Sequence, residues 1–129
     1  MNTVFEVMYR DGHNYKRCAD WVFAGAATPQ QMASVTAHLD NGIYFVPMQL
    51  GLEHLAVDTE WSFPTEIDHP WHELVGIEVT DRTPNMTQTV DEFVELFCST
   101  EWDDVTAWKE IVGEPADPAV PEAGCSADE

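Results

Sequence analysis

The densest group of acidic side chains lies near the carboxyl end of the 129-residue chain. It places six carboxylates and one tryptophan between positions 91 and 104: Asp91, Glu92, Glu95, Glu101, Trp102, Asp103 and Asp104. Rows of carboxylates on a rigid domain can imitate the phosphates of a nucleic-acid duplex, because a basic channel attracts both through the same long-range field. The cluster therefore predicts a surface that binds a basic protein partner, with the tryptophan as an aromatic anchor.

A second group in the middle of the chain combines nitrogen and oxygen ligands. Its members are His54, Asp68, His69, His72 and Glu73. Imidazole and carboxylate groups suit Zn²⁺ or another divalent metal, so a metal-binding protein or metal-dependent enzyme is the alternative interpretation. Residues 69–73 read HPWHE rather than HExxH, and the proline argues against both rings lying on one helical face. The competing interpretation is a set of turn-forming and hydrogen-bonded side chains.

No other pattern in the chain indicates catalysis. GxSxG, Walker and GxGxxG motifs are absent from the sequence, as is a Cys/His nucleophile pattern. His13 lies beside Asp11 and Asn14, where turn chemistry explains it. We therefore expect a protein that is not an enzyme and that needs no cofactor.

The charge of the chain limits its partners. Asp and Glu number 24 against five Lys and Arg, a formal charge of −19. Phosphates and anionic lipids repel such a chain, so we expect no direct binding to nucleic acid or membrane. A third interpretation is an acidic domain adapted to solubility or high salt, without a specific partner.

Composition and termini indicate one soluble domain. The chain is 44% hydrophobic, which is enough for a single core. Its first residues lack the basic start and apolar run of a signal peptide, so we expect a cytoplasmic protein. The cysteines are odd in number and widely spaced, which favours reduced thiols, and Cys18 and Cys98 read as small core residues.

The first half of the chain contains recognisable strand and helix signals. Residues 4–10 and 15–24 alternate as strands and flank Asp11-Gly12, which predicts a β-hairpin. Thr28, followed by Pro29 and Gln31, predicts the start of a helix with a capping box, and Asn41-Gly42 its end. Residues 43–46 read as a further strand.

The second half begins with an irregular connection over residues 48–70, with one short helical turn near its start. Three aromatic residues in or beside it are expected to pin it to the core: Trp61, Phe63 and Trp71. Residues 75–79 alternate as a strand. Thr89 and Glu92 form a second capping box at the start of a helix, and residues 102–112 suggest another.

This element order predicts an α+β fold. We expect a small antiparallel or mixed sheet with an N-terminal β-hairpin, and helices packed mainly on one face. Residues 1–112 would form a single acidic domain of net charge −14, from 19 acids and five bases. Residues 113–129 are rich in proline, alanine and acids, a composition typical of a disordered tail.

Three short stretches carry a resemblance to other proteins. Residues 9–16 read YRDGHNYK, residues 45–47 read FVP and residues 71–74 read WHEL. In these stretches the chain resembles small bacterial and phage-borne proteins that open with a YRDGxNYK-like hairpin. The resemblance implies a prokaryotic or mobile-element origin, which favours inhibition of a host factor, and it implies no catalytic residues.

Overall fold

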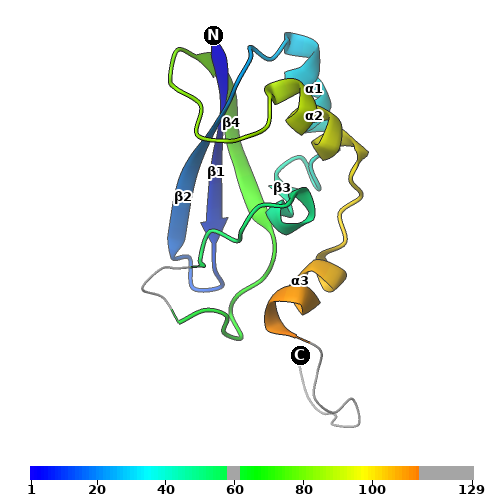
Figure 1. Cartoon of the computed structure of the whole chain (residues 1–129). Coiled ribbons are helices and arrows are strands. Elements are labelled where there is room, and N and C mark those ends of the chain that lie inside the picture. Colours follow the sequence, from blue (N-terminus) through cyan, green and yellow to red (C-terminus); the bar gives the residue numbers. More distant parts are fainter. Residues whose placement is uncertain (58–61, 114–129) are drawn as a thin grey trace.

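A long antiparallel hairpin organises the fold (Figure 1). The computed structural model describes residues 1–57 and 62–113 of the chain. Strands β1 (Asn2–Arg10) and β2 (Lys16–Phe23) pair along their whole length, with Phe5 opposite Trp21. The carboxylate of Asp11 accepts hydrogen bonds from the backbone N–H groups of His13 and Tyr15, which closes the turn between the strands.

Two further strands complete an antiparallel sheet with the order β2-β1-β4-β3. Strand β4 (His72–Thr80) pairs with β1, and the short β3 (Tyr44–Phe45) pairs with the beginning of β4. The sheet expected as antiparallel or mixed is therefore antiparallel. The irregular connection before β4 starts with one short 3₁₀ helix, η1 (Pro47–Leu50), as expected.

Strand β4 contains a β-bulge at Val75. Glu6 lies opposite Gly76 but Val7 lies opposite Leu74, so one residue of β4 has no partner on β1. Leu74 and Ile77 consequently both pack against the core, while the side chain of Val75 is 59% exposed. A strict two-residue alternation had predicted Val75 on the same face as Ile77, and the bulge makes that prediction wrong.

The helices lie to one side of the sheet in Figure 1 and enclose an aromatic core. Helices α1 (Pro29–His38) and α2 (Val90–Ser99) pack beside each other, and α3 (Asp104–Val112) follows after a four-residue linker. Together with the hairpin, this arrangement confirms the α+β fold class. No helix in the described ranges is both long and apolar enough to cross a membrane.

Cys18 departs from what the sequence predicted, and most of the carboxyl-terminal tail lies beyond the described residues. Cys18 is exposed on β2, not buried, because it lies on the strand face opposite the core, whereas Cys98 on α2 is partly buried. The tail expected from residue 113 lies outside the described residues except for Gly113, which follows the last turn of α3.

The capping box of α2 gives a first prediction. The Thr89 hydroxyl accepts from the backbone N–H of Glu92 at 3.2 Å, and the Glu92 carboxylate accepts from the backbone N–H of Thr89 at 2.9 Å. Thr89→Ala should lower the free energy of unfolding by about 1 kcal/mol, measured by urea denaturation. The control is Thr87→Ala at an exposed position outside the helix. Equal losses for the two variants would contradict the role of the cap.

Candidate functional site

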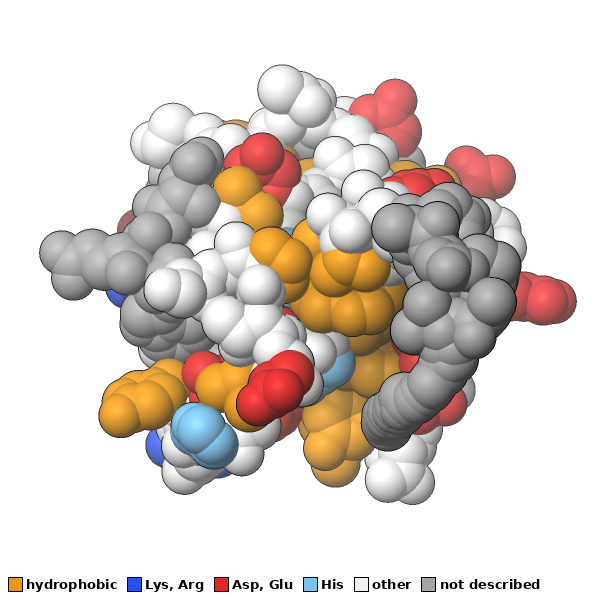
Figure 2. Space-filling view, turned by 90° about the horizontal axis from the view of Figure 1, so that it is seen from below, with side chains coloured by type: hydrophobic (Ala, Val, Ile, Leu, Met, Phe, Trp, Pro, Cys, Tyr) orange, Lys and Arg blue, Asp and Glu red, His pale blue; other side chains and the backbone are white. Residues whose placement is uncertain are grey.

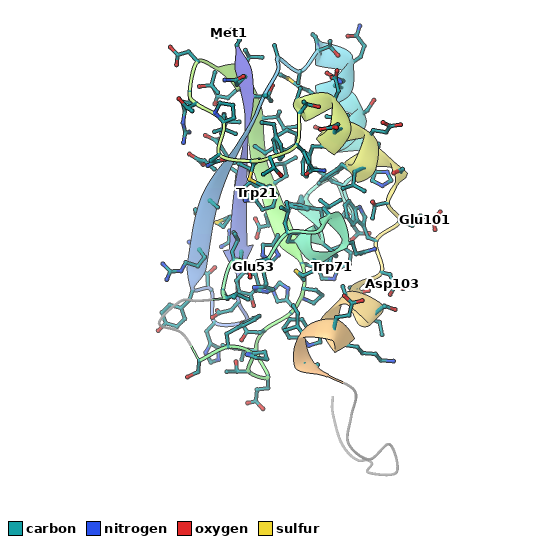
Figure 3. The ribbon with its side chains drawn as sticks, viewed as in Figure 1. Met1, Trp21, Glu53, Trp71, Glu101 and Asp103 are labelled. Atoms are coloured by element: carbon teal, nitrogen blue, oxygen red, sulfur yellow. The ribbon has the colours of Figure 1, made fainter. Side chains whose placement is uncertain are left out.

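The predicted acidic cluster lies on consecutive elements at the helical end of the described chain. We call this the acidic edge: Asp91, Glu92, Glu95, Glu101, Asp103 and Asp104. Its carboxylates follow α2, the linker of residues 100–103 and the first turn of α3. Glu101 and Asp103 lie on the side of the molecule that carries the helices, away from β2 (Figure 3). The structure therefore places the six carboxylates on consecutive elements, two of them, Glu101 and Asp103, on the helical side.

Three of these carboxylates also hold the helices in place. Glu92 belongs to the capping box of α2, and Asp91 accepts a hydrogen bond from the Gln31 amide at 2.8 Å, which ties α2 to α1. Asp103 is the N-cap of α3 and accepts from the backbone N–H and the hydroxyl of Thr106. These two bonds hold the pKa of Asp103 below its usual range.

The other three carboxylates of the acidic edge are available to a partner. Glu95, Glu101 and Asp104 make no side-chain hydrogen bond or ion pair with the described part of the chain. Glu95 and Glu101 are exposed and Asp104 is half-buried. These three charges supply the field that a basic surface would meet.

Trp102 and Gln49 fix the linker that carries Glu101 and Asp103. The Trp102 indole N–H donates to the backbone carbonyl of His38 at 2.9 Å, and its half-buried ring packs edge-on against Phe97. The Gln49 amide donates to the carbonyl of Glu101 and accepts from the N–H of Asp103. No pattern in the sequence pointed to Gln49. Trp102 supports the acidic edge from inside, and its role as a partner anchor stays a prediction.

The basic residues do not neutralise the acidic edge. Arg10 pairs with Glu73 at 3.1 Å, and Arg82 pairs with Asp20 at 2.9 Å. Residues 90–112 contain seven acids and only Lys109 as a base, a net charge of −6. In the view of Figure 2, acidic side chains surround the face on several sides, whereas basic side chains show at only one. The segment of residues 90–112, which carries α2 and α3, is therefore strongly negative.

The predicted metal ligands come together around a buried tyrosine. Tyr9 lies on β1, and its ring centroid is 4.2 Å from that of His54 and 5.1 Å from those of His69 and His72. Its hydroxyl donates to the Asp68 carboxylate at 2.5 Å. We call these five residues the histidine cluster. Glu73, the remaining predicted ligand, pairs with Arg10 instead.

Backbone groups occupy both ring nitrogens of each histidine in this cluster. On each ring, one nitrogen accepts from a backbone N–H and the other lies within hydrogen-bond distance of a backbone carbonyl, which fixes a neutral tautomer. His54 accepts from the N–H of Ala56 and lies against the carbonyl of His69. His69 accepts from the N–H of Trp71 and lies against the carbonyl of Arg10. His72 accepts from the N–H of Leu55 and lies against the carbonyl of Pro70. A metal would have to displace these bonds. Across residues 1–57 and 62–113, no three His, Cys, Asp or Glu side chains are placed to hold one metal ion.

Burial keeps two histidines of the cluster, His54 and His72, uncharged. It lowers the pKa of His54 to about 4 and the pKa of His72 well below its usual value. Burial and the bond to Asp68 raise the pKa of Tyr9. The arrangement can therefore orient loops and fill the interior, with His54 and His72 neutral near pH 7.

The aromatic residues of the irregular connection attach it to this cluster. Phe63 is half-buried, with its ring 4.3 Å from that of His54 and 6.0 Å from that of Trp108 on α3. Trp71 is half-buried against Tyr44. Trp61 lies outside the described residues.

Comparisons with models of protein families, with curated proteins and with solved structures find no match. The functional interpretation therefore depends on the charge and geometry of this chain.

Proposed function

We propose that the protein is a non-enzymatic acidic module that binds a basic protein, with a nucleic-acid-binding protein as the partner class. The acidic edge would occupy the positively charged surface that otherwise holds nucleic acid, so the module would act as an inhibitor that mimics nucleic acid. The observation that carries the proposal is the set of uncompensated carboxylates, Glu95, Glu101 and Asp104, on a firmly held backbone.

The fixed position of these carboxylates supports recognition rather than solubility alone. Gln49 and Trp102 hold the linker, and the Asp103 cap holds the start of α3. A preorganised surface loses less conformational freedom when it binds, so more of the electrostatic attraction appears as affinity. The net negative field would also accelerate the encounter with a basic partner.

A charge-matched pair of variants tests the proposal. The edge variant combines Glu95→Gln, Glu101→Gln and Asp104→Asn, and the control variant replaces three exposed acids elsewhere: Glu53→Gln, Glu66→Gln and Glu78→Gln. Both lose three negative charges. We expect the edge variant to associate with its partner about tenfold more slowly in stopped-flow measurements, and the control variant to stay close to the unmodified protein.

The partner itself would be captured from a prokaryotic lysate at about 0.1 M and 0.5 M salt, where the Debye length falls from about 10 Å to about 4–5 Å. A partner retained at the lower salt and released at the higher salt supports charge-driven binding. Equal losses in the edge and control variants would contradict the assignment to the acidic edge. Absence of any partner, with stability that rises in molar salt, would favour the interpretation as a domain adapted to high salt.

A further inference from the structure

A cavity of about 460 Å³ opens between the end of β1, the turn before β3 and the start of β4. Its volume is in the range of sites that hold small organic groups. Two aromatic rings, Tyr44 and Trp71, and three carboxylates, Asp11, Asp40 and Glu73, contribute to its lining. Trp71, labelled in Figure 3, stands immediately before β4. We call this space the aromatic cavity.

The charges around the aromatic cavity favour a cation. Arg10 is the basic residue of the lining, and its guanidinium is already bound to Glu73 at 3.1 Å and to Asn14 at 2.6 Å. Three carboxylates against one guanidinium leave a net charge of −2. The Asp40 carboxylate makes no hydrogen bond or ion pair with residues 1–57 or 62–113. An anion would be repelled, and a cation would find an uncommitted carboxylate.

The histidine in the lining does not change this balance. His69 lies within 2.8 Å of the Arg10 carbonyl through one ring nitrogen and accepts from the Trp71 N–H through the other. This bonding pattern needs the neutral ring, because a protonated imidazole has no acceptor nitrogen. His69 therefore adds no positive charge to the cavity, and it fixes the backbone that carries Trp71.

The aromatic rings supply the second element of cation recognition. The centroids of Tyr44 and Trp71 lie 6.4 Å apart with their planes at 66°, and both side chains are half-buried. The negative face of an aromatic ring attracts a cation, and tryptophan does so most strongly. Aromatic faces beside an uncommitted carboxylate can recognise both the charge of an organic cation and its apolar stem.

We propose that the aromatic cavity binds an alkylguanidinium or alkylammonium group between Trp71 and Asp40. In the context of the proposed function, on which this assignment of the source rests, the group is an arginine or lysine side chain of the basic partner. The acidic edge would then attract the partner over a distance, and the cavity would receive one of its side chains. A free organic cation has the same chemistry and is the other source that the experiment distinguishes.

The test is a titration of the ¹⁵N-labelled full-length protein with N-acetyl-arginine amide, followed by NMR. N-acetyl-citrulline amide is the matched probe, because it keeps the shape of arginine without the charge. We expect the arginine probe to shift the Trp71 indole resonance and the citrulline probe to leave it in place. Asp40→Asn and Trp71→Ala should each weaken binding about tenfold, and Trp71→Phe less. Glu78→Gln, at an exposed position outside both the cavity and the acidic edge, should leave binding unchanged.

Further outcomes separate this proposal from the proposed function. If the arginine probe binds and Asp40→Asn also weakens the captured partner, the cation is a side chain of that partner. If the probe binds and the partner is unaffected or no partner is found, the cavity takes a free organic cation, and the proposal for the cavity stands alone. If the citrulline probe binds equally well, or if Asp40→Asn and Trp71→Phe bind the arginine probe as the unmodified protein does, the proposal is wrong. Asp40 is exposed, so its substitution keeps the test independent of folding.

Discussion

Replacing Phe93 with alanine is expected to lower the free energy of unfolding by about 3–5 kcal/mol. The side chain is 0% exposed. Its ring stacks on that of Phe23 at 4.2 Å and meets that of Phe5 edge-on at 5.1 Å, so it joins α2 to both strands of the hairpin. The close-packed rings around it can relax only partly into the cavity that alanine would leave.

Urea denaturation followed by far-ultraviolet circular dichroism measures this loss. Phe93→Leu keeps most of the volume and should lose clearly less stability than Phe93→Ala. The surface control is Val105→Ala, because Val105 is 60% exposed on α3 and its replacement should change stability by no more than about 0.5 kcal/mol. Similar effects of Phe93→Ala and Val105→Ala would show that the core is not organised around Phe93.

Acidification is expected to destabilise the protein through its buried histidines. The folded state lowers the pKa of His54 from 6.5 to about 4 and lowers that of His72 well below 6.5. As the pH falls below about 6.5, the unfolded chain binds protons that the folded chain does not, so the free energy of unfolding falls. His54 alone lowers the free energy of unfolding by about 1.4 kcal/mol per pH unit, and the total reaches about 3 kcal/mol near pH 4. Above pH 7 this loss is absent.

The pH dependence of the free energy of unfolding, compared between variants, separates the effect of the histidines from that of the many carboxylates. Their protonation relieves self-repulsion in all variants alike, so the informative quantity is the difference in slope between variants. His54→Gln should reduce the loss between pH 6.5 and 4, and His13→Gln should leave it unchanged because His13 is exposed in the hairpin loop. Identical slopes for the unmodified protein and His54→Gln would refute the explanation. Histidine NMR titration provides a direct reading of the same pKa.

Local signals in the sequence predicted the helix starts because the groups that determine them are close neighbours. The capping boxes of Thr28 with Gln31 and of Thr89 with Glu92 are both confirmed. The end of α1 was predicted less well, since the helix stops at His38 rather than at Asn41-Gly42. Asn41 and Gly42 do adopt positive φ, at 55° and 72°, but within the turn that leads to β3.

The histidine cluster could be predicted only in part. The sequence showed which side chains had ligand chemistry, yet its centre, Tyr9, meets Asp68 across 59 positions of the chain. Such contacts follow from how β1 and the irregular connection pack, which no local pattern reveals. The same holds for Gln49, whose bonds to the linker span more than 50 positions. The acidic edge was easier to anticipate because adjacent helix ends place most of its residues.

The β-bulge at Val75 determines which changes of chain length the sheet can tolerate. Without this extra residue, Leu74 and Ile77 would lie two positions apart and would still pair opposite Val7 and Phe5 in a regular ladder, so both would stay on the core face. A Cβ atom at Gly76 would lie 3.0 Å from a carboxylate oxygen of Glu6, the end of a flexible side chain that can move aside. A deletion of Val75 is therefore expected to be tolerated better than a one-residue deletion elsewhere in β4, which would exchange the faces of the residues on one side of it. Insertions in an exposed loop are also tolerated, because their entropic cost grows only slowly with length.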